Sequence, residues 1–291
     1  MKNGNLKNTY LFLAVLTIGS GCQGSRSETQ STNSNDSRDS RSASSCFALV
    51  NGQLDSNGDY RAVIALKNGR SLCTGTFVSD NTLLTAAHCV TPSAPGGGLR
   101  TVINGRTLIP LQALLSPMPS GKEREPKDDV AVIIFEDGTS DIWFDLSRFP
   151  PKIGQRITVV GFGQTDFIGD NRSDEKRRFG ENTISDLPDK GATIKYELTV
   201  HEDGSAIGDD VMTGRGDSGG PLFLGNGLIG IVSRGEGKIN KGKLIEYDAN
   251  LVTTEMEKFL KSTVKRGARI NGLELMGKAA NITSNGLGAC M

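Results

Sequence analysis

Short apolar runs, separated by turn-forming glycine and asparagine residues, recur along this 291-residue chain and limit the folds that it can adopt. Each run is too short for a core helix but long enough for a strand, for which about four to eight residues suffice. Asn68-Gly69 and Asn226-Gly227 separate neighbouring runs with residues that tight hairpins prefer. We therefore expect an all-β fold, with one late helix over Thr253–Val264, where apolar residues recur at helical spacing. The expected strands are Tyr60–Leu66, Leu72–Ser79, Thr82–Ala86, Asp129–Phe135, Arg156–Gly161, Thr193–His201, Pro221–Leu224, Leu228–Ser233 and Leu244–Ala249.

The charges of the chain balance, because 33 Lys and Arg residues face 33 Asp and Glu residues. Proteins that bind nucleic acid usually carry an excess of positive charge, so nucleic acid is not an expected partner. The sequence shows neither the ligand spacing of a metal site nor the glycine-rich loop of a phosphate site. We expect neither a metal nor a cofactor.

Residues 1–21 have the pattern of a secretory signal peptide. Lys2 and Lys7 precede the apolar stretch Tyr10–Ile18, which is too short to span a membrane. Small residues then lead to Cys22, a pattern that resembles a bacterial lipobox, in which the cysteine is lipidated. Gln23 resembles the signal that sorts such proteins to the outer membrane. We expect an extracytoplasmic protein, either anchored in the outer membrane through lipid on Cys22 or secreted without an anchor.

Residues 22–48 are expected to form a disordered tether or propeptide, because they are mostly polar and cannot bury apolar surface. Export also permits disulfide bonds. Cys73 and Cys89 flank a histidine and could form one bridge. Cys46 and Cys290 lie near the two ends of the folded part and could form another. The alternative for these cysteines is that they are buried free thiols.

Three segments carry the residue types of nucleophilic catalysis. Ser218 lies among glycines, which let several backbone N–H groups point into one space and stabilise an oxyanion. His88 follows an apolar run, and its imidazole can take up and return a proton near neutral pH. Asp129 precedes another apolar run, where a partly buried carboxylate can orient a histidine. Taken singly, these are ordinary features of turns and strand ends. The second histidine, His201, is expected on the surface.

Together these segments resemble the three signatures of chymotrypsin/trypsin-like serine proteases, in that family's order. They are Thr85-Ala86-Ala87-His88-Cys89, Asp129-Val130-Ala131 and Gly216-Asp217-Ser218-Gly219-Gly220-Pro221. Two further segments are similar to family motifs, except that Phe162 and Arg234 stand in place of tryptophan. The resemblance implies two packed six-stranded antiparallel β-barrels of chymotrypsin type with a C-terminal helix. It places the protease domain at residues 49–264 and leaves residues 265–291 as a tail.

The resemblance also implies roles for individual residues. Ser218 would be the nucleophile, His88 the general base and Asp129 the acid that orients the histidine, in preference to the adjacent Asp128. The N–H groups of Gly216 and Ser218 would form the oxyanion hole. Ser233 would support Asp129 through a hydrogen bond, and a Cys73–Cys89 disulfide would lie beside the histidine.

The segment that begins at Leu49 resembles the mature N-terminus of the family. In the family, a cut before this segment frees an α-amine, which pairs with the acid before the nucleophile, here Asp217. We therefore expect a zymogen that another protease activates by cutting between Ala48 and Leu49. Because Ala48 is neither lysine nor arginine, the activating protease should prefer small residues.

The primary specificity pocket is expected to contain Met212, Thr213, Ser233, Gly235 and Ile245. Trypsins have an aspartate where this chain has Met212, and a buried basic side chain would lack its partner here. We therefore expect cleavage after apolar residues of small to medium size. Arg215 and Arg234 either line the substrate cleft and favour acidic neighbours or face the solvent.

The sequence thus predicts an exported serine endopeptidase that acts on protein or peptide substrates. The alternative is a catalytically silent homologue that binds a partner at the cell surface, although all three triad positions are filled. An esterase of the α/β-hydrolase type is disfavoured, because such enzymes have the chain order serine, acid, histidine, whereas this chain has histidine, aspartate, serine.

Overall fold

The computed structural model describes residues 49–69, 71–90, 98–103, 106–118, 120–165, 173–236 and 238–276. The predictions for the signal peptide, the tether and Cys22, Cys46 and Cys290 lie outside these residues. All described residues belong to the unit Ser45–Met291. Among them, no helix is both long enough and apolar enough to cross a membrane.

The N-terminal half forms one antiparallel sheet of seven strands in the order β6-β5-β2-β3-β4-β8-β7. Its central strands β3, β4 and β8 are almost entirely buried, because they lie between neighbouring strands and the rest of the fold. Within the described residues no pairing joins β6 to β7, so this sheet is a half-barrel. Its strands are β2 (Val63–Asn68), β3 (Ser71–Phe77), β4 (Thr82–Thr85), β5 (Leu99–Ile103), β6 (Arg106–Leu108), β7 (Gln112–Leu115) and β8 (Ala131–Ile134).

The C-terminal half forms a second antiparallel sheet in the order β1-β10-β11-β14-β13-β12-β9. Strand β9 also pairs with β10, and this contact closes six of the strands into a barrel. In β11, Ile194, Tyr196 and Leu198 point into the core, as the two-residue period of a strand requires. The strands are β1 (Gln53–Leu54), β9 (Arg156–Gly161), β10 (Arg178–Asp186), β11 (Thr193–Thr199), β12 (Pro221–Leu224), β13 (Gly227–Gly235) and β14 (Lys243–Asn250).

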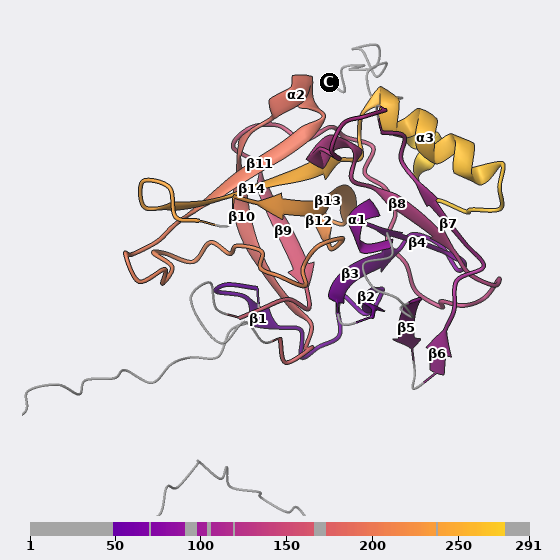
Figure 1. The fold of residues 1–291 in the computed structure, drawn as a ribbon, viewed down its shortest axis with the longest axis horizontal. Helices are drawn as coiled ribbons and strands as arrows, with labels where there is room; N and C mark the ends of the chain where they lie inside the picture. The colour runs from indigo at the N-terminus through magenta and orange to yellow at the C-terminus, as the bar shows by residue number, and fades with distance from the viewer. Residues whose placement is uncertain are drawn as a thin grey trace, which may run out of the picture. The chain divides into compact units, whose positions relative to one another are not determined.

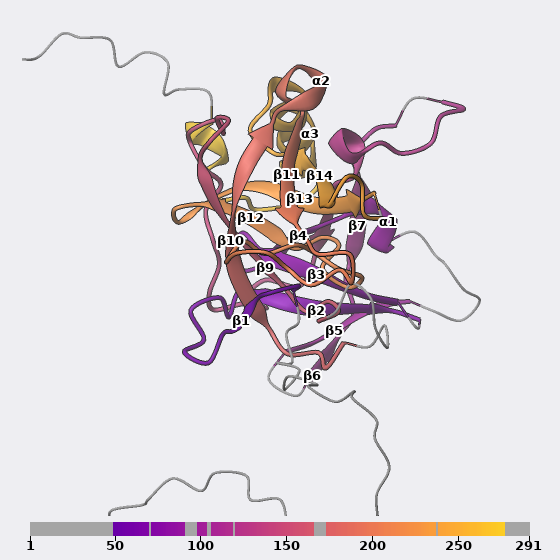
Figure 2. The ribbon, with the colours of Figure 1, turned by 90° about the vertical axis from the view of Figure 1, so that its left-hand side faces the viewer.

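The two sheets lie side by side in both views of the fold, with the indigo and purple strands next to the pink and orange ones (Figures 1 and 2). A backbone hydrogen bond from Thr74 on β3 to the carbonyl oxygen of Ser218 connects them at 2.8 Å. The predicted all-β fold of chymotrypsin type is therefore confirmed. The difference from the prediction is that the first of its two barrels is an open sheet of seven strands.

The late helix α3 spans Thr254–Val264, as its apolar spacing predicts. Thr253 caps it, because its side chain accepts a hydrogen bond from the backbone N–H of Met256 at 3.1 Å. The face with Met256 and Leu260 is buried. Further short helices in the described part of the chain include α1 (Ala87–Val90), α2 (Pro188–Gly191) and the 3₁₀ turn η1 (Pro126–Asp128).

The segment after α3 differs from the predicted tail. Residues 265–276 pack against the N-terminal sheet, and Ile270 and Leu273, the first residue of the 3₁₀ turn η2 (Leu273–Leu275), are buried. The guanidinium of Arg269 forms ion pairs with Asp80 and Asp137 at the edge of this sheet. The folded part of the chain therefore continues at least to residue 276.

Candidate active site

His88 lies on α1, directly after the buried strand β4. Its ring nitrogen Nδ1 is 2.6 Å from Oδ2 of Asp129, and its backbone N–H donates to Oδ1 of the same carboxylate at 2.9 Å. Two hydrogen bonds to one carboxylate fix both the histidine ring and the turn that carries it. Nδ1 therefore carries the proton in this contact, and Nε2 is left as the nitrogen that can act as a base.

Asp129 lies just before β8, and only 4% of its surface is exposed. Its Oδ2 also accepts a hydrogen bond from the hydroxyl of Ser233 on β13 at 2.7 Å. Burial alone would raise the pKa of Asp129, but the hydrogen bonds and charge of His88 and the bond from Ser233 outweigh it and lower that pKa. The neighbouring Asp128 lies in η1, and the histidine contacts described here all involve Asp129.

Ser218 lies in the turn that leads into β12, and it lines the same cavity as His88 and Asp129. Gly219, the next residue, has a φ of 82°, and a side chain there would collide with Thr85 and the backbone of Thr74. Thr74 also donates through Oγ1 to the carbonyl oxygen of Gly216 at 2.9 Å. Glycine at position 219 thus lets the serine turn sit directly against the N-terminal sheet.

A hydrogen bond fixes the orientation of the peptide between Arg215 and Gly216. The carbonyl oxygen of Arg215 accepts a hydrogen bond from the N–H of Gln164 at 2.9 Å. The N–H of Gly216 belongs to the same peptide plane and therefore points the opposite way. Within the described chain, the N–H groups of Gly216 and Ser218 donate to no protein acceptor. Both remain available to an oxygen atom of a substrate.

Asp217 is completely buried behind the serine turn. Its two carboxylate oxygens accept hydrogen bonds from the N–H groups of Gly163 at 2.7 Å and Gly214 at 2.8 Å. Burial raises the pKa of Asp217 to about 6, because the two amide hydrogen bonds only partly offset the loss of water. In this chain Leu49 is joined to Ala48 and has no free α-amine. Among the described residues, Asp217 has no ion-pair partner.

Leu49 is also completely buried and has a φ of 53°, in the left-handed region. The next residue, Val50, forms a β-bridge with Met212, and its carbonyl oxygen accepts from the N–H of Met212 at 3.1 Å. The segment predicted to become a new N-terminus therefore already packs in the core of the C-terminal barrel, and its bridge partner Met212 precedes Asp217 by a few residues.

The cavity beside Ser218 has a volume of about 580 Å³. All five residues predicted for the primary pocket line it, together with His88, Asp129 and Ser218. Its other residues come from several segments of the chain and include six that the sequence analysis did not assign to the site. Those six are Arg124, Gln164, Gly214, Val232, Leu244 and Glu246.

Glu246 is an acidic residue that the sequence analysis did not place in this cavity, and only 4% of its surface is exposed. Burial and then the neighbouring Asp248 raise its pKa well above the ordinary value. Burial also raises the pKa of Asp248 to about 8. Burial thus favours the protonated, uncharged form of both side chains at this wall of the cavity. The two-residue period of β14 places Glu246 and Asp248 on the same face as Leu244, a signal that the sequence analysis did not use.

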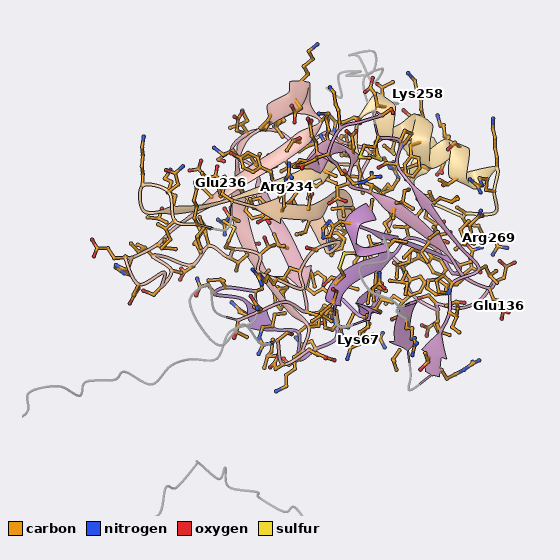
Figure 3. All side chains as sticks on the ribbon, in the orientation of Figure 1. Lys67, Glu136, Arg234, Glu236, Lys258 and Arg269 are labelled. Atoms are coloured by element: carbon orange, nitrogen blue, oxygen red, sulfur yellow. A yellow bond between two sulfur atoms is a disulfide. The ribbon has the colours of Figure 1, made fainter. Side chains whose placement is uncertain are left out.

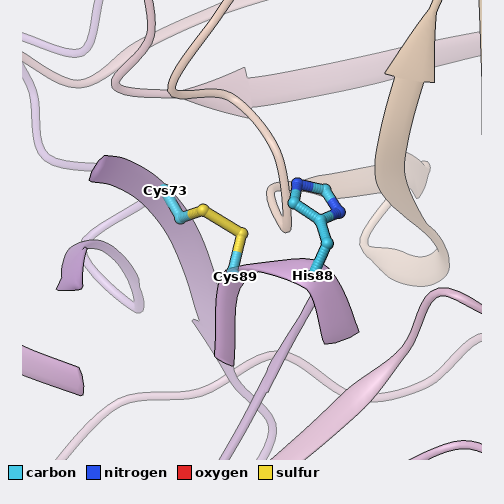
Figure 4. A group of neighbouring side chains, drawn as sticks. All are labelled: Cys73, His88 and Cys89. Carbon is cyan, nitrogen blue, oxygen red and sulfur yellow. A yellow bond between two sulfur atoms is a disulfide. The ribbon is translucent and has the colours of Figure 1, made fainter. Parts of the chain in front are cut away.

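Cys73 and Cys89 form the predicted disulfide bond next to His88 (Figure 4). The sulfur atoms and a ring nitrogen of His88 lie within 4.8 Å of one another, a grouping that could suggest a metal site. A metal would need thiolate ligands, and here both sulfurs are used in the disulfide. The cluster therefore holds the histidine turn against β3.

Removing this disulfide should destabilise the fold. The bond closes a loop across 16 positions, and loops of that length contribute about 3 kcal/mol by restricting the unfolded chain. The double variant Cys73→Ala, Cys89→Ala should lose about that much free energy of unfolding in urea titration. The oxidised wild type and the wild type with reductant are the controls. An unchanged unfolding midpoint in both the variant and the reduced protein would contradict this prediction.

Comparison with known proteins agrees with this geometry. The trypsin family model matches residues 49–252. Trypsin of Saccharopolyspora erythraea is 28% identical over 209 residues, which cover 67% of this chain and 90% of that protein. An uncharacterized peptidase of Corynebacterium glutamicum (strain R) is 25% identical over 194 residues, or 66% of this chain and 64% of the relative.

Among solved structures, neuropsin, a serine protease expressed in the limbic system of mouse brain, has the same fold. Its TM-score is 0.59 at 21% identity, and the match covers 74% of this chain and all of the neuropsin chain. The family match spans more than half of the chain and includes the histidine, aspartate and serine segments. The chain therefore belongs to the trypsin family of serine endopeptidases.

Proposed function

We propose that this chain is an exported endopeptidase that cleaves peptide bonds through an acyl-enzyme on Ser218, with His88 as the general base and Asp129 as the orienting acid. The observation that carries the proposal is the chain of hydrogen bonds from Ser233 through Asp129 to His88, in a cavity that Ser218 also lines. Each of these side chains comes from a different segment, so the fold is needed to assemble them.

In the proposed reaction, Oγ of Ser218 attacks the carbonyl carbon of the scissile bond, and its proton passes to Nε2 of His88. Asp129 keeps the proton on Nδ1 and stabilises the imidazolium that forms. The N–H groups of Gly216 and Ser218 donate to the oxyanion of the tetrahedral intermediate.

When the C–N bond breaks, His88 gives its proton to the leaving amine, and the acyl group remains as an ester on Ser218. A water molecule then attacks the ester while His88 takes a proton from it. Breakdown of the second tetrahedral intermediate returns that proton to Ser218. The products are a carboxylic acid and an amine, and the enzyme is regenerated.

We propose that the residue on the acyl side of the scissile bond is apolar. Met212, Val232 and Ile245 give the cavity an apolar lining, and burial raises the pKa of Glu246, which favours its uncharged form. A lysine or arginine side chain would bury its charge without an ionised partner, which typically costs about 3 kcal/mol or more. A cost of that size corresponds to a factor of about a hundred.

A panel of peptides that differ only in this residue tests the assignment at pH 7. We expect kcat/KM to be about a hundredfold higher after alanine, valine or leucine than after lysine or arginine. Glu246→Gln, which replaces the acid with an uncharged side chain of the same size, should keep the preference for apolar residues. Fastest cleavage after lysine or arginine would contradict the proposal and would identify Glu246 as an ionised partner of the basic side chain.

We also propose that a cut between Ala48 and Leu49 activates the enzyme. The new α-amine of Leu49 would pair with Asp217, which is buried and forms no ion pair within the described residues of the uncut chain. The bridge between Val50 and Met212 supports this arrangement, because it already holds the segment inside the same barrel. The activating protease is proposed to prefer small residues, because Ala48 precedes the cut.

Export itself is part of the proposal. The disulfide between Cys73 and Cys89 supports an oxidising compartment outside the cytoplasm. The signal peptide, the lipid on Cys22 and an anchor in the outer membrane rest on the sequence pattern of the N-terminus. Mass spectrometry of the purified protein would identify both its N-terminus and any lipid on Cys22.

A further inference from the structure

Three arginines line the cavity that also contains Ser218 and His88. Arg124 precedes η1, Arg215 lies in the serine turn, and Arg234 lies on β13, so three separate parts of the chain contribute them. Arg215 and Arg234 are exposed, while Arg124 is half-buried. Figure 3 labels Arg234 near the centre of the fold, beside Glu236. The cavity thus combines the proposed catalytic groups with three positive charges.

These three guanidinium groups lack carboxylate partners among the described residues. Elsewhere in the same part of the chain, Arg156, Arg177 and Arg178 each form an ion pair with an aspartate. No such pair includes Arg124, Arg215 or Arg234, although other exposed arginines are also unpaired. The distinguishing feature of these three is therefore their shared place around the cavity rather than the lack of a partner alone.

Arg124 is fixed in place without being neutralised. Its Nη1 donates to the carbonyl oxygen of Ser116 at 3.2 Å and to the hydroxyl of Ser116 at 3.0 Å, and also contacts the carbonyl oxygen of Asp128. These acceptors carry no net charge, and its other guanidinium nitrogens have no acceptor within the described residues. A side chain that is already ordered loses less entropy when it binds a partner.

The acids of the cavity do not offset these positive charges. Asp129 accepts hydrogen bonds from His88 and Ser233, and the buried Glu246 forms no ion pair with any of the three arginines among the described residues. The complete chain has a net charge of zero, so the positive charge is a local property of the cavity. A local site of this kind fits a short acidic peptide better than a long polyanion, which binds through an extended basic surface.

We propose that Arg124, Arg215 and Arg234 select substrates with aspartate or glutamate within a few residues of the scissile bond. This inference rests on the proposed catalytic function, because it assigns further contacts in the same cavity. A guanidinium can bind a carboxylate through two parallel hydrogen bonds, which gives both attraction and orientation. Because Arg215 and Arg234 are exposed and Arg124 is half-buried, each contact should change kcat/KM by about fivefold, which equals about 1 kcal/mol.

The test uses pairs of fluorogenic peptides with the same residues on both sides of the scissile bond. Within a pair, one flanking position carries glutamate in one peptide and the isosteric glutamine in the other. Rates are measured on processed enzyme whose active serine has been titrated with a fluorophosphonate. We expect glutamate to raise kcat/KM about fivefold at one or more flanking positions, and salt to reduce this preference.

The variants Arg124→Gln, Arg215→Gln and Arg234→Gln assign the contacts. Each should bring the glutamate peptide down to the rate of its glutamine partner at one flanking position. Arg266→Gln is the matched control, because Arg266 is exposed, lies beyond α3 and is not part of the cavity. That control should keep the full preference for glutamate.

Two results would overturn the inference while leaving the catalytic proposal intact. In the first, titrated enzyme cleaves glutamate and glutamine peptides at equal rates for every position. In the second, the glutamate preference exists but survives in all three arginine variants. If no serine can be titrated in processed enzyme, the catalytic proposal itself fails, so the two failures are distinguishable.

Discussion

Replacing Ser218 with alanine, or His88 with alanine, should lower kcat for peptide hydrolysis by about a millionfold. Losses of about this size follow removal of the nucleophile or the base from other enzymes with such a triad. The physical reason is that Oγ of Ser218 forms the covalent bond, and that the imidazole held by Asp129 accepts its proton. Asp129→Asn should cost about 10⁴-fold, because an amide favours the wrong tautomer of the imidazole. Each kcat is measured on a peptide substrate.

The chain offers a matched control for the histidine variant. It contains only two histidines, and His201 is exposed and does not line the cavity. His201→Ala should therefore keep kcat within about twofold, since surface substitutions change little. Circular dichroism and thermal unfolding should confirm that all variants fold. A His88→Ala enzyme that keeps more than a tenth of the wild-type kcat would rule out His88 as the general base.

The uncut and cut forms of the protein should respond to pH in opposite directions because of Asp217. In the uncut chain, burial raises the pKa of Asp217 from 3.8 to about 6. Because the pKa of Asp217 is higher in the folded than in the unfolded protein, its protonated carboxyl group stabilises the fold below about pH 4. This stabilisation is lost as the pH rises to about 6. At about 1.4 kcal/mol per pH unit, the loss amounts to about 3 kcal/mol.

After the cut, the α-amine of Leu49 should pair with Asp217 and lower its pKa below the ordinary value. The carboxylate then stabilises the folded protein above about pH 4, and this stability is lost only as pH falls. Thermal unfolding between pH 4 and pH 7 measures both cases, using a Ser218→Ala background to prevent self-digestion. Asp217→Asn is the reference in each form, because it cannot ionise while the other titrating groups stay the same. Identical pH profiles for the uncut and cut forms would show that Asp217 does not receive the new amine.

The sequence predicts much of this site because its catalytic residues lie in short local motifs. Ser218 and its glycines are contiguous, and the turn conformation depends on residues next to one another. His88 and Asp129 are each placed beside a strongly apolar run, and these runs become β4 and β8, which pair directly. The pairing brings both residues to the same edge of the sheet, so two local signals are enough to indicate their proximity.

The residues that sequence reasoning missed depend on contacts between distant segments. Arg124 enters the cavity because its guanidinium reaches the carbonyl oxygens of Ser116 and Asp128, which no local pattern indicates. Glu246 lies on an inward-facing position of β14, where a buried acid contradicts the usual preference for apolar residues. This matters for substrate specificity, because a prediction from Met212 alone leaves out Glu246, an ionisable residue in the same cavity.

The strands β1, β5, β6, β7 and β10 and the C-terminal segment were missed for a related reason. In β10, the buried positions include Arg178 and Asn182, so this strand of nine residues lacks an apolar face. β6 and β7 are only three and four residues long and are partly exposed, so they show little apolar contrast. After α3, single apolar residues such as Ile270 and Leu273 are separated by polar residues and glycine. They become buried because the folded N-terminal sheet offers them a surface, which is a tertiary effect.

The most direct test of the account is covalent labelling of processed protein with a fluorophosphonate, followed by peptide mass spectrometry. We predict a single phosphonylated residue, Ser218, with loss of peptide hydrolysis in proportion to labelling. Labelling should be absent from Ser218→Ala and much slower in His88→Ala, while His201→Ala should label like the wild type. A protein that hydrolyses peptides but carries no label on Ser218 would contradict the proposed mechanism.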